Sequence, residues 1–214
     1  MSSVYSARIE HVLPTPFGLR AEVEHLCAEA RTEGYRAVVV PSSRVAEAYE
    51  AIEGSSVKVS CLIGFPLGWS DPDAKRYEIE AAVDAGAHEI EYVPSLARLK
   101  EQQYPAVLRE LRDAAEACDE RPLKVLVEAS LWSLEELEDI VKTVLDSGAK
   151  YLSTGFLSSL DQLVQTRDLA GDGFGLKCEI PSLELAEAAF ESGADLISLA
   201  RLARPAAKSR DFGI

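Results

Sequence analysis

Eight short apolar runs, rich in valine and isoleucine, alternate along this chain with longer amphipathic stretches. Apolar runs bounded by turn residues indicate strands, and strands that alternate with helical patterns indicate one parallel sheet. Closing eight such units gives an α/β fold of the (β/α)₈ TIM-barrel type, for which ~200 residues is the small end of the range. A flavodoxin-like open sheet of five strands would leave three runs unplaced. The expected strands lie at 8–13, 35–41, 57–65, 88–94, 123–129, 151–156, 173–180 and 195–200.

The composition fits a single domain over residues 1–214 and narrows the range of partners. Hydrophobic residues make up 47% of the chain and the formal net charge is −14. This charge would repel the phosphates of a nucleic acid or an anionic membrane. No apolar run reaches the ~18 residues that a membrane span needs, and the opening MSSVYSARIEHVLPTP lacks the pattern of a signal peptide. We therefore expect a cytoplasmic protein without nucleic-acid or membrane partners.

Metal ions and cofactors are not expected either. The four cysteines are scattered without a CxxC pair, and the three histidines lie far apart in the sequence. Structural and catalytic metal sites need such ligands at close, regular spacing.

A weak internal sequence repeat aligns three of the expected strands with one another. The segments DAGAHEIEYV, DSGAKYLSTG and ESGADLISLA each place an acidic residue and a glycine before a strand. Glycine suits the left-handed position that ends a helix. Counting five residues beyond that glycine reaches Glu91, Ser153 and Ser198, which we expect at comparable positions on the fourth, sixth and eighth strands.

Charged residues lie inside two of the expected strands. Because side chains alternate along a strand, Lys124 and Glu128 share one face of the fifth strand, and Lys177 and Glu179 share one face of the seventh. A buried lysine is costly unless it is paired, so Glu91 and Glu128 are the expected partners. Catalytic residues of such barrels lie at the carboxyl ends of the strands, which predicts an active site there.

The chain resembles the deoxyribose-phosphate aldolase family through IEH at 9–11, VKVSCLIGFPLG, GAHEIEYV, LKVLVEA and GLK. The IGFPLG segment at 63–68 is the most specific of these. The resemblance implies a TIM barrel and a lyase that forms a Schiff base on a lysine of the sixth strand. It also implies that Lys177 is the lysine that lowers the pKa of this nucleophile. By the same resemblance Glu91 is the proton-relaying acid, and Lys124 is the lysine of the fifth strand.

The Schiff-base lysine itself is absent. Aligned through SGA at 147–149, its position holds Ser153, and aligned through STGF at 153–156 it holds Tyr151. The neighbouring Lys150 points away from the face of Ser153 by the two-residue alternation of a strand. The usual nucleophile is therefore missing in either alignment.

Two turns that hold a substrate phosphate in the family are also altered. Glycine-rich turns bind phosphate through backbone N–H groups. After the seventh strand this chain has EIPS, in which Pro181 removes one donor. After the eighth strand it has LARLARP, where Arg201 or Arg204 would supply charge instead. We therefore expect a substrate without phosphate.

Two kinds of chemistry fit these residues. In an aldolase-type carbon–carbon lyase, Lys177 or Lys124 would replace the nucleophile, since repulsion between lysines on adjacent strands would lower one pKa. Glu91 would then relay protons. In the alternative, the same three residues would catalyse an isomerase, cyclase or dehydratase reaction without a covalent intermediate. Both act on a small carbonyl compound, with a binding set of Ser153, Thr154, Glu128 and Ser198.

A third hypothesis is a non-catalytic binding barrel. Such a barrel would have both lysines neutralised by carboxylates and no cavity above them. Two costly buried lysines argue against it. The sequence is also compatible with a homodimer.

Overall fold

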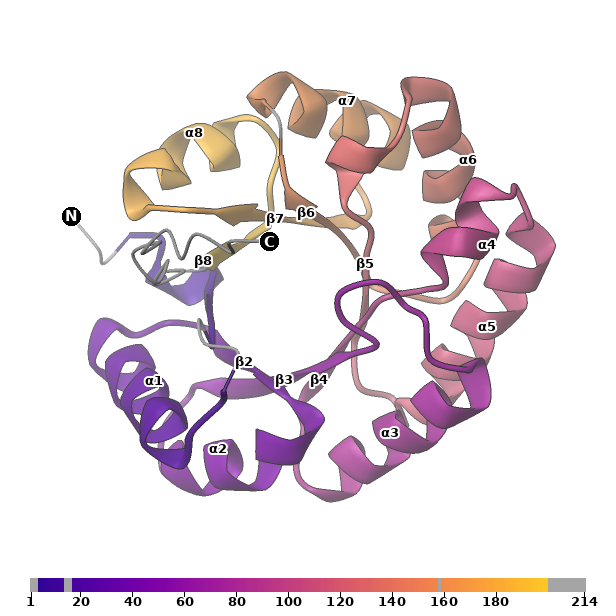
Figure 1. Cartoon of the computed structure of the whole chain (residues 1–214). Helices are drawn as coiled ribbons and strands as arrows, with labels where there is room; N and C mark the ends of the chain where they lie inside the picture. The colour runs from indigo at the N-terminus through magenta and orange to yellow at the C-terminus, as the bar shows by residue number, and fades with distance from the viewer. Residues whose placement is uncertain (1–3, 14–16, 158, 200–214) are drawn as a thin grey trace, which may run out of the picture.

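Eight parallel strands close into a barrel in chain order, as Figure 1 shows in a view along its axis. The computed structural model describes residues 4–13, 17–157 and 159–199. The prediction of a (β/α)₈ barrel is confirmed, and each of the eight expected runs contains a strand. These are β1 (Ile9–Val12), β2 (Ala37–Pro41), β3 (Lys58–Ile63), β4 (Glu89–Tyr92), β5 (Leu123–Leu126), β6 (Tyr151–Phe156), β7 (Gly175–Ile180) and β8 (Leu196–Leu199).

Helices form a ring around the barrel (Figure 1). Short 3₁₀ turns precede β1, α2, α6 and α8. None of the described helices is long and apolar enough to cross a membrane. The α-helices are α1 (Arg20–Glu33), α2 (Val45–Ala51), α3 (Pro72–Asp84), α4 (Leu96–Lys100), α5 (Tyr104–Ala117), α6 (Leu134–Leu145), α7 (Leu160–Ala170) and α8 (Ala186–Glu191).

The start of α6 illustrates how the sequence sets a helix boundary. The Ser133 hydroxyl accepts a hydrogen bond from the backbone N–H of Glu136 at 3.2 Å. The Glu136 carboxylate in turn accepts from the backbone N–H of Ser133 at 2.9 Å. This reciprocal capping box satisfies two backbone donors that the helix itself leaves unpaired.

The two faces of the strands differ in chemistry. One face is apolar and packs against the helices, where Val38, Ile90, Val125 and Cys178 are fully buried. The residues between them point into the barrel and include several acids and lysines that are also almost fully buried. Burying that many charges is costly, because each loses its hydration unless an opposite charge replaces it. The barrel interior is therefore where function is to be sought.

Candidate active site

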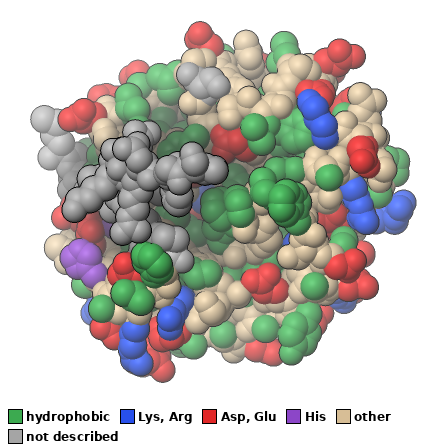
Figure 2. Space-filling view, in the orientation of Figure 1, with side chains coloured by type: hydrophobic (Ala, Val, Ile, Leu, Met, Phe, Trp, Pro, Cys, Tyr) green, Lys and Arg blue, Asp and Glu red, His purple; other side chains and the backbone are tan. Residues whose placement is uncertain are grey.

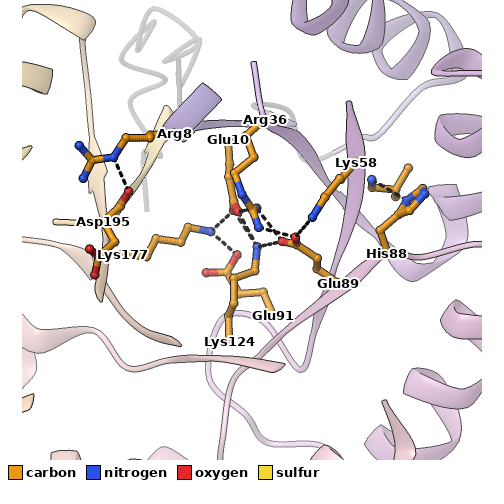
Figure 3. A network of polar contacts seen from close by, with 11 residues as sticks. Arg8, Glu10, Arg36, Lys58, His88, Glu89, Glu91, Lys124, Lys177 and Asp195 are labelled. Atoms are coloured by element: carbon orange, nitrogen blue, oxygen red, sulfur yellow. Dashed lines mark hydrogen bonds and ion pairs between the residues drawn. The ribbon is translucent and has the colours of Figure 1, made fainter. Parts of the chain in front are cut away.

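Glu10 on β1 lies at the centre of the barrel and binds three cations (Figure 3). Its two carboxylate oxygens each lie 2.8 Å from Nζ of Lys124. Oε2 also accepts from Nζ of Lys177 at 2.6 Å, and Oε1 accepts from Arg36 at 2.6 Å. Burial alone would raise the pKa of Glu10, but the two lysines and the arginine outweigh it and hold the pKa well below its usual value. Glu10 is therefore ionised at neutral pH and forms the hub of this network.

A second carboxylate extends this network toward the amino end of the barrel. Glu89 on β4 accepts from Nζ of Lys124 at 3.1 Å and from Lys58 at 3.3 Å. It also receives two hydrogen bonds from the Arg36 guanidinium. Burial opposes the ionised form, but Lys124 and Arg36 hold the pKa of Glu89 below its usual value. Lys124 is 0% exposed and both of its partners are carboxylates.

Lys177 on β7 is held between two carboxylates. Its Nζ lies 2.6 Å from Oε2 of Glu10 and 2.5 Å from Oε2 of Glu91 on β4. Burial disfavours the ammonium, but Glu10 and Glu91 outweigh burial and raise the pKa of Lys177 above its usual value. An imine-forming amine must be neutral part of the time. Lys177 is therefore a fixed positive charge rather than a ready nucleophile.

The expected repulsion between the two lysines is not what this geometry produces. Strand β6 lies between β5 and β7, so Lys124 and Lys177 are not on adjacent strands. The carboxylate of Glu10 binds both ammonium groups and screens one from the other. The expectation of a lowered pKa is wrong for Lys177, because carboxylates rather than a second cation surround it.

A cavity of about 1160 Å³ opens above this network, at the carboxyl ends of the strands. Figure 2 shows the hollow, with hydrophobic side chains gathered around it. Three of the predicted site residues line it, namely Glu91, Glu128 and Ser198. Among the described residues, the lining does not include Lys124, Lys177, Ser153 or Thr154. Lys177 is linked to the cavity through Glu91, which lines it, whereas Lys124 contacts Glu10 and Glu89 instead.

Glu179 on β7 also lines the cavity, and no role was assigned to it from the sequence. Its carboxylate makes no hydrogen bond or ion pair with any residue that the structure describes. Burial and the nearby charges of Glu91 and Glu128 raise the pKa of Glu179 to about 7, against a smaller lowering by Lys177. A carboxylate that titrates near neutral pH is well suited to general acid–base catalysis. The two-residue spacing from Lys177 was the signal for this residue.

Glu128 follows β5 and faces the same cavity. Its Oε1 accepts from the Ser130 hydroxyl at 2.9 Å, and burial raises the pKa of its carboxyl group. Gly155 makes this position available, since a Cβ there would overlap the Glu128 carboxylate and its φ is +64°. The expectation that Glu128 pairs with a lysine is wrong, because its carboxylate turns toward β6 and Ser130.

The remaining predicted residues lie in the barrel wall. Ser153, which is 2% exposed, is in register with Lys177 on the neighbouring strand. The Thr154 hydroxyl donates to the backbone oxygen of Lys177 at 3.2 Å, which ties β6 to β7. Ser198 is in register with both Glu10 and Glu179. Contact of Ser153 or Thr154 with a substrate stays a prediction.

The charged groups around the cavity are mostly acidic. Among the described lining residues, four carboxylates face a single cation, Arg44. The Arg44 guanidinium already donates to the backbone oxygen of Gly18 at 2.6 Å and to Glu47 at 2.7 Å. After β7, the Ser182 hydroxyl caps the next turn by accepting from Glu184 N–H at 3.3 Å. Arg201 and Arg204 lie outside the described residues.

Replacing Glu10 with glutamine should lower the free energy of unfolding by ~3–5 kcal/mol, since two buried lysines would lose a shared carboxylate. Urea unfolding measures this, with Glu24→Gln in an exposed pair on α1 as the control. Because the pKa of Glu10 lies below its usual 4.5, its contribution is present above that pH and is lost as the pH falls further. Equal stability of the two variants at pH 7 would show that Glu10 is not the hub.

Comparisons with known proteins agree on one family, although no family model matches the chain. A deoxyribose-phosphate aldolase of Metamycoplasma hominis is 35% identical over 185 residues, covering 84% of this chain and 85% of that protein. A deoxyribose-phosphate aldolase of Bdellovibrio bacteriovorus is 32% identical over 196 residues, covering 88% and 89%.

Solved structures give the same result. An aldolase called QR15 superposes with a TM-score of 0.87 at 28% identity, covering 92% of this chain and 91% of that one. The deoxyribose phosphate aldolase from Aeropyrum pernix, described as a unique tetramer, has a TM-score of 0.85 at 28% identity, covering 92% and 87%.

Proposed function

The chain belongs to the deoxyribose-phosphate aldolase family and is an aldolase-like lyase, and we propose that it acts on a small, non-phosphorylated carbonyl compound without forming an imine. One observation carries this proposal. The carboxylate of Glu179, which has no hydrogen bond or ion pair with the described residues, titrates near pH 7 on the cavity wall, whereas Lys124 and Lys177 are both bound by carboxylates. A carboxylate base is thus better placed for the chemistry than either lysine.

The proposed reaction begins at the α-carbon of the substrate. The Glu179 carboxylate takes the α-proton, and the electron pair of the broken C–H bond moves into the carbonyl group to give an enolate. The enolate carbon then attacks the carbonyl carbon of a second compound, the π electrons of that C=O bond move to its oxygen, and the resulting alkoxide takes back the proton that Glu179 carries. In the reverse direction the same carboxylate takes the hydroxyl proton of the aldol as the carbon–carbon bond breaks.

The buried network supports this step electrostatically. Lys177 neutralises the charge of Glu91 beside the cavity, so that an enolate forming there meets one fewer uncompensated carboxylate. Lys124 keeps Glu10 in position, so that Lys177 cannot swing away from Glu91. Glu128 and Ser198 are the proposed substrate-binding groups on the cavity wall, and no cofactor is proposed.

The charge of the cavity supports a substrate without phosphate. The relatives are named for a phosphorylated sugar. Here, among the residues that the structure describes, four carboxylates face one arginine, which is already hydrogen-bonded elsewhere. A phosphate dianion placed there would be repelled. The exposed apolar side chains at the cavity mouth suit a less polar compound.

The other hypotheses fit less well. An imine on Lys177 or Lys124 requires the amine to lose a proton and leave two carboxylate partners. An isomerase, cyclase or dehydratase would share the same proton abstraction and is distinguished by its product. A non-catalytic binding barrel would explain two neutralised lysines, but it was expected to have no cavity above them, and it gives the raised pKa of Glu179 no role. A cytoplasmic location and a homodimer stay predictions.

The test is exchange of α-protons for deuterium, followed by NMR, with acetaldehyde, propanal and hydroxyacetone. We expect the protein to catalyse exchange with at least one of them, while borohydride added to the same mixtures leaves no adduct on Lys177 or Lys124. Peptide mapping of the treated protein checks this. An adduct on either lysine would restore the imine hypothesis, and no exchange with any carbonyl compound would favour the binding barrel.

A further inference from the structure

A second buried ion pair lies outside the barrel, between α3 and α5. Nζ of Lys75 is 2.7 Å from Oε1 of Glu110, and the two side chains are 0% and 1% exposed. Neither residue contacts the central network, and neither is among the described residues that line the cavity. Burying this pair costs hydration on both sides, so the pair itself contributes little net stability and its other contacts are of more interest.

The lysine end of the pair holds the segment between β3 and α3. Nζ of Lys75 donates to the backbone oxygen of Val93 at 3.1 Å and to that of Gly68 at 3.5 Å. Gly68 N–H also donates to the backbone oxygen of Gly64 at 2.8 Å, which closes the segment into a tight loop. A Cβ on Gly68 would overlap the backbone of Pro94, so the loop is pressed against the end of β4.

The glutamate end holds the chain that leaves β4. Oε1 of Glu110 accepts from the Tyr92 hydroxyl at 3.0 Å and from the backbone N–H of Ser95 at 3.2 Å. One carboxylate oxygen thus joins α5, β4 and the start of α4, while its ion pair with Lys75 adds the loop after β3. Four segments meet at this single contact.

The loop that is held in this way forms one side of the cavity mouth. Residues 64–70 carry Phe65, Leu67 and Trp69, which all line the cavity. Their side chains are 60%, 38% and 80% exposed, so they are not held by packing of their own. In Figure 1 the segment between β3 and α3 projects over the end of the barrel. Its backbone anchors are Gly64 and Gly68.

We propose that Lys75 and Glu110 are positioning residues that fix the loop at 64–70 as a wall of the cavity and thereby determine which substrates bind. Neither residue touches the reacting atoms. Releasing the loop moves the apolar side chains that a substrate contacts but leaves Glu179 and the central network in place. The expected change in KM rests on the proposed function, whereas the expected loosening of the loop at 64–70 does not.

The first readout is hydrogen–deuterium exchange of the peptide that covers 64–70, in the full-length protein without substrate. In Lys75→Met and in Lys75→Met/Glu110→Leu we expect about tenfold faster amide exchange in this peptide. Arg76→Met is the matched control, since Arg76 lies on the same helix in an exposed pair with Glu80. The double variant is included because the single one removes the nearest cation from the buried Glu110 carboxylate and is therefore destabilised, whereas an apolar pair is tolerated.

The second readout is the kinetics of α-proton exchange with propanal. The variants should raise KM about tenfold and leave kcat within about twofold of the wild-type value, as expected when binding contacts alone are lost. Gly68→Ala should do the same with the ion pair intact, because its Cβ displaces the loop directly. A fall in kcat at constant KM would assign the pair a catalytic role and overturn the proposal.

Two outcomes of the amide exchange would also overturn it. One is wild-type exchange over 64–70 in the folded double variant. The other needs no variant: if the Gly68 amide of the wild-type protein exchanges as fast as an unstructured chain, the loop is not held. Neither outcome depends on turnover, so a failure of the proposed chemistry is distinguishable from a failure of this inference.

Discussion

Glu179→Gln should lower kcat for α-proton exchange about a thousandfold, within the usual range for removal of a general base. Glutamine keeps the size and hydrogen-bonding capacity of the side chain but cannot accept the proton. Because the carboxylate of Glu179 has no ion pair within the part of the chain that the structure describes, the substitution breaks none there and leaves the central network intact. KM should therefore change little. NMR detection of deuterium incorporation measures both constants.

The pH dependence of the exchange rate provides a second test of the role of Glu179. Since the base is active only when ionised, the wild-type rate should rise with pH through about 7, the pKa of Glu179, and then level off. The matched control is Glu184→Gln, five residues further along the chain and exposed to solvent. It should keep both the rate and the pH profile. A Glu179→Gln variant that retains the wild-type rate would require a different base.

The contribution of Glu179 to the free energy of unfolding should fall with rising pH, whereas the rate rises. The folded protein binds the Glu179 proton more tightly than the unfolded chain does, since its pKa is raised from 4.5 to about 7. The stabilisation that results is present below pH 4.5 and is lost as the pH rises through 7. Glu179→Gln does not ionise, so its free energy of unfolding should fall less over that interval. Denaturant unfolding at pH 5 and pH 8 compares the two proteins.

The fold followed from the sequence because the strand signal is local. Each apolar run is bounded by turn residues, and eight of them leave few topologies open. The alternation of side chains also placed Lys124, Lys177 and Glu91 inside the barrel, where the structure brings them together. The two-residue alternation of side chains is a reliable guide here because parallel strands are buried on both faces, so a charged residue inside such an apolar run is conspicuous in the sequence.

The ion pairs and pKa values of the site could not be predicted from the sequence, because they depend on contacts between distant segments. Glu10 lies 114 residues before Lys124 and 167 before Lys177, and only closure of β1 against β8 brings it to both. The raised pKa of Glu179 depends on burial and on the charges of Glu91 and Glu128, which belong to other segments and which no local pattern reveals. Glu128 was expected to bind a lysine, but the chain turns away after β5 and presents its carboxylate to the cavity instead.

Ser153→Lys should create the imine chemistry that the wild-type protein lacks. Position 153 is in register with Lys177, whose ammonium is fixed by Glu10 and Glu91. Ser153 is 2% exposed, so an amine at this position would be buried, and the carboxylates of Glu10 and Glu91 are already bound to Lys177. Burial and the neighbouring ammonium of Lys177 lower the pKa of the new amine and keep part of it neutral near pH 7.

We expect borohydride treatment with acetaldehyde to leave one adduct on residue 153 in most Ser153→Lys chains, and none there in the wild-type protein. Intact mass and peptide mapping measure it, and trapping should increase with pH as the amine loses its proton. Ser153→Met is the control, because it has an unbranched chain but no amine. A folded Ser153→Lys protein that reacts only at surface lysines would show that the cavity no longer presents a carbonyl group to this position. The serine would then be one of several changes that closed the imine route, rather than the change that removed it.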